Sequence, residues 1–133
     1  MNPRDELVNK GIPFSHLVFS DESKHENGRY WGIGAVSCAY PNYSKIKNEI
    51  KRLLDESDVT EFEWKKLKTA KYKFAAEKMV DYAIRLAVNN EIRIDVITWD
   101  MHDSRHKNII GRDDEENFAR MYFHLYKNIL CHR

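Results

Sequence analysis

The sequence predicts an α/β domain in which a mixed sheet carries helices packed on its faces. Two apolar runs near the N-terminus are joined through Asn27-Gly28, which is a strong signal for a β-hairpin. Helical and strand patterns then alternate along the rest of the chain. Because no repeat or linker interrupts this order, we expect a single domain over residues 15–133, preceded by a polar lead over residues 1–14.

Two strands are expected in the hairpin. The first is predicted over residues 15–21, where Leu17, Val18 and Phe19 form the apolar run that a strand buried on both faces requires. The second is predicted over residues 29–39, where glycines alternate with large side chains. The first strand therefore ends in an aspartate, and the second begins directly after the turn.

Apolar residues at spacings of three and four predict three helices, over residues 43–56, from Thr69 to residue 88, and from Asp113 to the C-terminus. Thr69 and Asp113 are residue types that accept hydrogen bonds from the free N–H groups of a first helical turn. Between the second and third helices, residues 92–99 are rich in β-branched and aromatic side chains, which predicts a third strand.

The composition excludes several classes of protein. The 22 Lys and Arg residues nearly balance the 21 Asp and Glu residues, so any contact with nucleic acid would need a local basic patch. The apolar runs are too short to span a bilayer, and the N-terminus has no apolar signal core. Two cysteines do not make a disulfide framework. We therefore expect a cytoplasmic protein with reduced thiols and no membrane contact.

Three carboxylates are candidates for a metal site. Asp21 and Asp100 each end a predicted strand, and Glu63 lies in a segment whose spacing fits neither a helix nor a strand. Carboxylates that converge at one sheet end repel each other unless a cation lies between them, and hard oxygen ligands suit Mg²⁺ or Mn²⁺. Two such ions can activate a water for phosphodiester cleavage. The alternative is that these three, like most of the 21 acids, are solvated surface groups.

The motifs around these acids resemble a known family. Phe19-Ser-Asp-Glu-Ser23, then Glu61-Phe-Glu-Trp-Lys65, then a strand ending Val96-Ile-Thr-Trp-Asp100 resemble the ribonuclease-H-like family called domain of unknown function 3800. The resemblance covers residues 15–130 and implies a ribonuclease-H-like mixed sheet.

The resemblance also implies roles for single residues. Asp21 would be the central catalytic metal ligand, with Glu63 and Asp100 as its partners and Glu61 as the competing choice for the second acid. Lys24 stands where the family usually has glycine. The family pattern continues with a further strand and a helix bearing a Gln-x-x-Asp-like motif, so the resemblance implies a domain that is truncated at its C-terminus.

A local basic patch accompanies the second acid. Lysines cluster beside Trp64 and Tyr72, and cations next to aromatic rings can hold a phosphate backbone while a base stacks. The alternative is the solvated face of an amphipathic helix. The candidate nucleic-acid-binding residues are Lys65, Lys66, Lys68 and Lys71.

Two classes of function follow from these observations. The first is a divalent-metal-dependent nuclease or other phosphodiester-processing enzyme. The second is a non-catalytic module of the same type, which binds or assembles and has lost part of the acidic site. We also expect a homodimer or a partner chain, since residues 92–99 would form an exposed edge strand and residues 118–130 carry a long apolar stripe.

Overall fold

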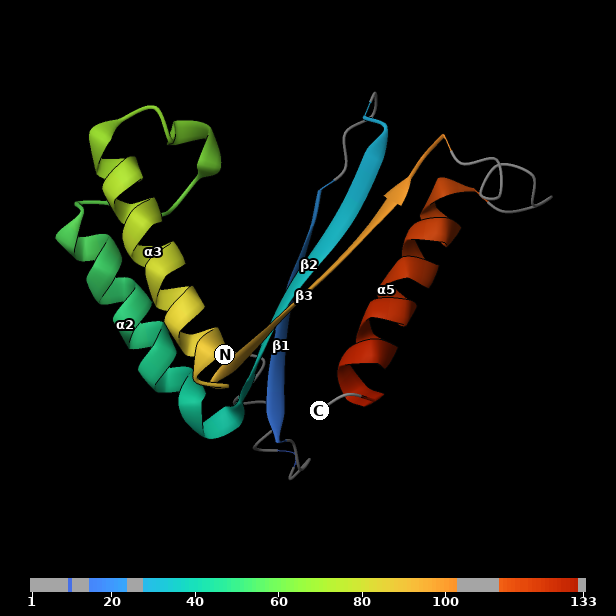
Figure 1. Ribbon diagram of the computed structural model, residues 1–133, viewed down its shortest axis with the longest axis horizontal. Coiled ribbons are helices and arrows are strands. Elements are labelled where there is room, and N and C mark those ends of the chain that lie inside the picture. Colours follow the sequence, from blue (N-terminus) through green and yellow to red (C-terminus); the bar gives the residue numbers. More distant parts are fainter. Residues whose placement is uncertain (1–9, 11–14, 24–27, 103–112, 132–133) are drawn as a thin grey trace. The chain divides into compact units, whose positions relative to one another are not determined.

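The computed structural model describes residue 10 and residues 15–23, 28–102 and 113–131 (Figure 1). The chain divides into two compact units, unit 1 (Met1–Leu17 and Ser37–Arg93) and unit 2 (Val18–Val36 and Ile94–Arg133). The described elements are β1 (His16–Ser23), β2 (Tyr30–Ala39), the 3-10 turn η1 (Tyr40–Asn42), α2 (Tyr43–Glu56), the 3-10 turn η2 (Trp64–Lys66), α3 (Ala70–Val88), β3 (Ile92–Asp100) and α5 (Asp114–Cys131).

The predicted strands and helices are found close to their predicted bounds, except that β1 continues to Ser23 and does not end at Asp21. The predicted ribonuclease-H-like mixed sheet is wrong. The three strands form an antiparallel sheet in the order β1-β2-β3. The backbone N–H of Met101 donates to the carbonyl of Arg29 at 2.6 Å, which joins the end of β3 to the start of β2. The part of the prediction that made β3 an edge strand is confirmed for the described strands.

The connection between β2 and β3 explains the antiparallel sheet. A single crossover helix would have delivered the chain to the far end of the sheet and produced a parallel pair. Instead, α2 leads away from the end of β2 and α3 returns beside it (Figure 1). Because two helices bring the chain back to the end of the sheet that it left, β3 begins next to the end of β2 and runs in the opposite direction.

Unit 1 is built on this helix pair. Leu53 of α2 and Tyr82 and Leu86 of α3 pack with Cys38 of β2 and Ile92 of β3. A second cluster lies at the other end of the two helices, where hydrophobic burial fixes the segment between them. It consists of Val59, Tyr72 and Ala75, with Leu54 and Phe62 packed against it.

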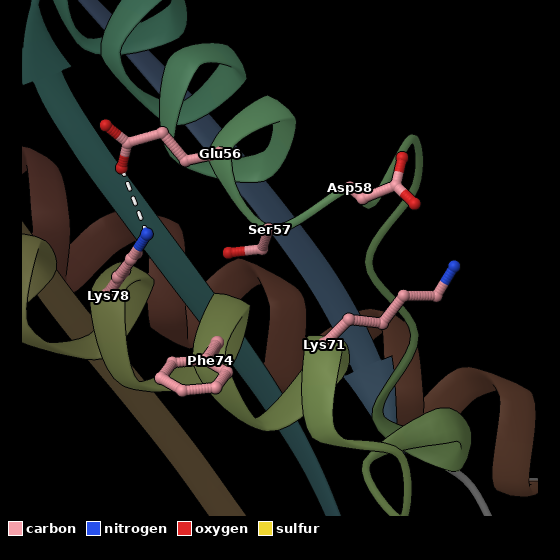
Figure 2. Close-up of a pocket in the computed structure, with 6 residues that line it drawn as sticks. All are labelled: Glu56, Ser57, Asp58, Lys71, Phe74 and Lys78. Atoms are coloured by element: carbon pink, nitrogen blue, oxygen red, sulfur yellow. Dashed lines mark hydrogen bonds and ion pairs between the residues drawn. The ribbon is translucent and has the colours of Figure 1, made fainter.

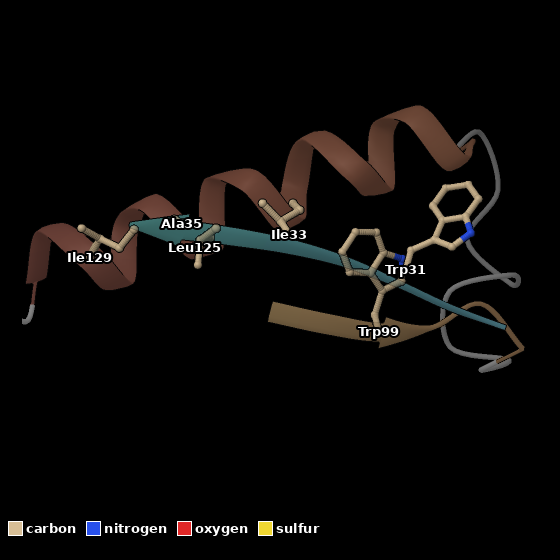
Figure 3. Close-up of a cluster of buried hydrophobic side chains, with 6 residues drawn as sticks. All are labelled: Trp31, Ile33, Ala35, Trp99, Leu125 and Ile129. Atoms are coloured by element: carbon tan, nitrogen blue, oxygen red, sulfur yellow. The ribbon is translucent and has the colours of Figure 1, made fainter. Parts of the chain in front are cut away.

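Unit 2 is one layer of sheet covered by α5. Figure 3 shows its core, in which side chains from alternate positions of β2 meet residues of α5 and β3. Phe118 adds an aromatic cluster, with its ring 5.9 Å from that of Trp31 and 5.3 Å from that of Trp99. Most of the α5 stripe that we expected to need a partner is therefore covered within unit 2. The buried residues of the unit 2 core are Trp31, Ile33, Ala35, Trp99, Leu125 and Ile129.

The predicted helix ends are confirmed in position and differ in their chemistry. The Asp113 carboxylate accepts from the backbone N–H of Glu116 at 2.8 Å, which is the predicted N-cap of α5. Thr69 occupies the N-cap position of α3, but its hydroxyl donates to the carbonyl of Lys66 instead. Asn90 follows α3 with φ of 58°, a left-handed conformation that asparagine tolerates.

Several sequence predictions lie wholly or partly outside the described residues, including most of the polar lead, the Asn27 turn position and the loop over residues 103–112. Among the described helices, none is both long and apolar enough to cross a membrane. Cys38 is buried and Cys131 is exposed, and neither is joined in a disulfide.

Candidate functional site

Asp21 and Glu22 are adjacent on β1 of unit 2, so their side chains leave opposite faces of the strand. The Asp21 carboxylate is exposed and accepts a hydrogen bond from the backbone N–H of Glu22 at 2.9 Å. Among the described residues, no cation lies within ion-pair distance of Asp21.

Glu22 is turned toward α5, where two tyrosines meet β1. The hydroxyl of Tyr122 donates to the Glu22 carboxylate, and the hydroxyls of Ser20 and Tyr126 are 2.6 Å apart. The two tyrosine rings are stacked, with centroids 6.2 Å apart. The hydrogen bond to Glu22 is the main cause that raises the pKa of Tyr122 to about 12. Glu22 thus anchors α5 to β1.

Asp100, the last residue of β3, is held by a guanidinium. Arg29 donates to its carboxylate from Nε at 3.0 and 3.1 Å and from Nη2 at 2.8 Å, and the backbone N–H of His102 donates at 2.9 Å. The hydrogen bonds from Arg29 are the largest cause that lowers the pKa of Asp100. A metal ion at Asp100 would have to compete with this fork-shaped ion pair.

The register of the sheet separates Asp21 from Asp100. Counting from the 2.8 Å bond between Tyr40 N–H and the Ser15 carbonyl places Asp21 beside Gly34. The bond that joins Met101 to Arg29 places Asp100 beside the first residue of β2. The two aspartates are thus two strand spacings apart, about 10 Å, and about 13 Å apart along the strands. Unit 2 does not bring them to one cation.

Glu63 belongs to unit 1 and precedes η2. Its carboxylate pairs with Lys66 at 2.8 Å, and the hydrogen bond from that ammonium group is the largest cause that lowers the pKa of Glu63. The residues that the structure describes contain no group of three His, Cys, Asp or Glu side chains that could hold a metal ion. The site of Asp21, Glu63 and Asp100, with its Mg²⁺ or Mn²⁺, stays a prediction.

The aromatic and basic segment of unit 1 has a defined geometry. Phe62 packs against Tyr72 at a centroid distance of 6.2 Å and meets the Trp64 ring edge-on at 5.0 Å. Tyr72 itself is buried in the second cluster of unit 1. Phe62 therefore ties Trp64 to the core, while the Trp64 side chain is 64% exposed. The Trp64 ring is thus held by Phe62 and largely exposed to solvent.

The four candidate lysines follow Trp64 in the sequence, and they differ in their ion-pair partners. Lys66 is the member that forms an ion pair, with Glu63. The ammonium groups of Lys66 and Lys71 lie 5.7 and 5.9 Å from the centroid of the Tyr72 ring. Within the described part of the chain, Lys65, Lys68 and Lys71 have no carboxylate at ion-pair distance. Three of the four candidate lysines are thus without a direct ion pair to any described carboxylate.

A pocket of about 420 Å³ lies beside the first half of α3 (Figure 2). Phe74 lies between Lys71 and Lys78 on this helix, and its exposed ring forms part of the pocket wall. Glu56 holds the Lys78 ammonium group at 3.0 Å, whereas Lys71 extends along the side that carries Asp58. The pocket offers an aromatic surface and one unpaired ammonium group.

Trp64 also borders an apolar groove on another flank of α3. The groove has a volume of about 420 Å³, and Val80 and Ile84 form its exposed floor. Glu77 and Asp81 line it as well, and the Asp81 carboxylate pairs with Arg85 at 3.2 Å. The negative charges on this flank disfavour the binding of a polyanion in this groove.

Two partners of these acids were not predicted from the sequence: Arg29, which pairs with Asp100, and Tyr122, which donates to Glu22. Arg29 stands directly before β2, so the pairing of β2 with β3 would have located it beside the end of β3. Tyr122 and Tyr126 are spaced by four residues, which places both hydroxyls on one helix face. This spacing is the sequence signal that could have identified the two tyrosines as neighbours.

Two curated archaeal proteins are similar to this chain, both from Methanothermobacter thermautotrophicus. "Uncharacterized protein ORF2'" is 40% identical over 129 residues, which are 90% of this chain and 45% of that protein. "Uncharacterized protein ORF2" is 38% identical over 123 residues, which are 86% of this chain and 43% of that protein. The chain spans less than half the length of these relatives, and their names state no activity.

No family model matches the chain, and no solved structure matches it. The resemblance of its motifs to domain of unknown function 3800 therefore stays a prediction.

Proposed function

We propose that this chain is a nucleic-acid-binding module that uses Trp64 and the lysines that follow it in the sequence of unit 1. The observation that carries the proposal is the exposed Trp64 ring, which is tied to the core through Phe62. The seven residues that follow it in the sequence include Lys65, Lys68 and Lys71, which have no carboxylate at ion-pair distance among the described residues. An aromatic ring that is already held by a neighbouring side chain loses little side-chain entropy when it stacks on a nucleobase. Single-stranded nucleic acid offers unstacked bases together with a regular array of phosphates.

The local charge supports the same partner. The chain as a whole carries a formal net charge of +1, so attraction over long distances is weak. Residues 61–73 contain five lysines and two glutamates, a local excess of three positive charges. Since each phosphate contact contributes about 0.7 to the salt slope for a single strand, we expect binding with a slope near −2.

Fluorescence anisotropy with short labelled single strands of DNA and RNA tests this proposal. Trp64→Ala should weaken binding by about five- to 150-fold, the effect of losing one base–aromatic stack of about 1–3 kcal/mol. The matched control is Phe123→Ala, which removes another exposed aromatic ring, on α5. Equal affinities of the wild type and Trp64→Ala would contradict the proposal.

The lysines have a separate readout. The double substitution of Lys65 and Lys68 by Gln should reduce the salt slope by about 1.4 while leaving the fold intact, because both side chains are exposed. Lys127→Gln on α5 is the control for loss of a surface charge. A slope unchanged by the double substitution would remove these lysines from the interface.

A second candidate function is divalent-metal-dependent phosphodiester hydrolysis. The observation that favours it is Asp21, an exposed carboxylate on a rigid strand with no cationic partner among the described residues. Hard carboxylate oxygens of this kind fit Mg²⁺ or Mn²⁺, which would supply Lewis-acid activation. Because Asp100 is two strand spacings away and paired with Arg29, the ion would be held through Asp21.

Thermal unfolding with and without Mg²⁺ or Mn²⁺ tests this candidate. A bound ion should raise the melting temperature, since a ligand that binds only the folded state stabilises it. Asp21→Asn should abolish the shift and any cleavage of the bound strand. Melting that does not respond to either metal would favour the non-catalytic binding module.

A further inference from the structure

One face of the sheet in unit 2 is apolar and exposed. Side chains alternate along β2 and β3, so that one face packs under α5 and the other face turns outward. The outward side chains are between 40% and 68% exposed. We name this surface the open face; it consists of Phe19, Tyr30, Val36, Ile94 and Val96.

The open face differs from the usual solvated side of an antiparallel sheet. Such a side normally carries polar residues, which gives the alternation of apolar and polar positions. Here its centre is uncharged, and the charged groups Asp21 and the Arg29–Asp100 pair lie around it. Large apolar side chains exposed on one face, with charged groups around them, are typical of a protein interaction site.

The shape of the open face also fits a covering polypeptide. Gly32 and Gly34 occupy the central strand, so its middle presents backbone rather than side chains. A Cβ at Gly32 would meet the carbonyl oxygen of Ile97 at 3.3 Å, whereas at Gly34 there is open space. At these two positions the open face therefore presents backbone between the side chains of β1 and β3.

The length of the two relatives indicates what could cover the open face. The 129 matched residues are 45% of ORF2', so more than half of that protein lies outside the matched segment. The same holds for ORF2, of which 43% is matched. We propose that the open face is a docking surface for a polypeptide with an apolar face, corresponding to the part of these relatives outside the match. This surface is independent of the nucleic-acid site proposed for unit 1.

Thiol labelling compares the open face in the two proteins. Val96→Cys places a thiol at its centre in this chain, in a Cys131→Ser background that removes the exposed native thiol. Lys127→Cys on the exposed side of α5 is the control position. The same two positions, located by alignment, are changed in full-length ORF2' from Methanothermobacter thermautotrophicus after replacement of its exposed cysteines. The rate of maleimide labelling at Val96→Cys is divided by the rate at Lys127→Cys in each protein.

The expected result is a ratio near one in this chain and a ratio at least about tenfold lower in full-length ORF2', because a covered thiol reacts only during local opening. Equal ratios in the two proteins would overturn the proposal, since the face would then be open in the longer protein as well. A low ratio already in this chain would also overturn it. Light scattering would then show whether a second copy covers the face.

Discussion

At the scale of single residues, Asp100 shows how a neighbouring side chain changes the role expected of a carboxylate. At the end of β3 it looks like a metal ligand, but in the structure Arg29 and the backbone of His102 occupy its oxygens. The guanidinium group fits a carboxylate with two parallel hydrogen bonds, which gives the pair a fixed geometry. The Arg29 guanidinium therefore occupies the position beside Asp100 where a metal cation was expected.

Removal of Arg29 should free Asp100. In the wild type the pKa of Asp100 lies below its ordinary value of 3.8, mainly because of the hydrogen bonds from Arg29, and in Arg29→Gln it should rise. Since a lowered carboxyl pKa favours the folded state above the unfolded pKa, this contribution is lost as the pH falls below about 4. NMR titration of the side-chain carboxyl carbon measures both values. An unchanged pKa in Arg29→Gln would show that the ion pair is absent in solution.

The tyrosine that bonds Glu22 should titrate far from its ordinary value. The pKa of Tyr122 is raised from 10.0 to about 12, chiefly by its hydrogen bond to Glu22. Because a raised pKa means that the folded state holds the proton more tightly, stability should fall as the pH rises from 10 toward 12. Glu22→Gln should move the pKa of Tyr122 back toward 10, which ring-labelled tyrosine NMR can follow. Tyr126, on the next turn of α5, is the internal control.

At the scale of elements, α5 shows which part of an apolar stripe is structural. The sequence places both Ile129 and Leu130 in the predicted stripe, but Ile129 is 1% exposed and Leu130 is 78% exposed. The adjacent residues differ because successive helical positions point about 100° apart. Only Ile129 can reach the sheet of unit 2.

This difference predicts a matched pair of variants. Ile129→Ala should lower the free energy of unfolding by about 2–5 kcal/mol, because it leaves a cavity in a packed core. Leu130→Ala should change it by less than about 0.5 kcal/mol, as expected for an exposed position. Denaturant unfolding measures both. Similar losses in the two variants would mean that α5 is rotated from the position described.

At the scale of the whole molecule, each strand contributes to both compact units. The boundary between the units falls between Leu17 and Val18 in β1, between Val36 and Ser37 in β2, and at the corresponding point near the start of β3. A strand that passes from one core into the other loses its pairing if either core unfolds. Cooperative unfolding of the two units follows from this continuity.

Two probes can test this cooperativity. In a Trp64→Phe background, tryptophan emission reports Trp31 and Trp99 in the core of unit 2. Far-ultraviolet circular dichroism reports all the helices, of which α2 and α3 belong to unit 1. We expect coincident unfolding transitions in urea. Two separated transitions would show that the units unfold independently.

The sequence by itself determined the elements, because periodicity and end signals are local. The helical stripe over residues 43–56, the Asp113 cap and the end of the second helix at residue 88 depend only on neighbours in the chain, and all three are found in the structure. The buried face of β2 also follows from alternation along one strand. The exposed Trp64 and its lysines could be recognised as a cluster for the same reason.

The tertiary structure decided how those elements combine, because strand pairing depends on where the chain returns after a long connection. The helix pair brought β3 back beside β2, so the sheet became antiparallel and Asp100 came next to Arg29 rather than Asp21. Local patterns contain no information on such a contact between residues 71 positions apart. The same pairing left one face of the sheet in unit 2 apolar and exposed, which the composition of each strand alone could not reveal.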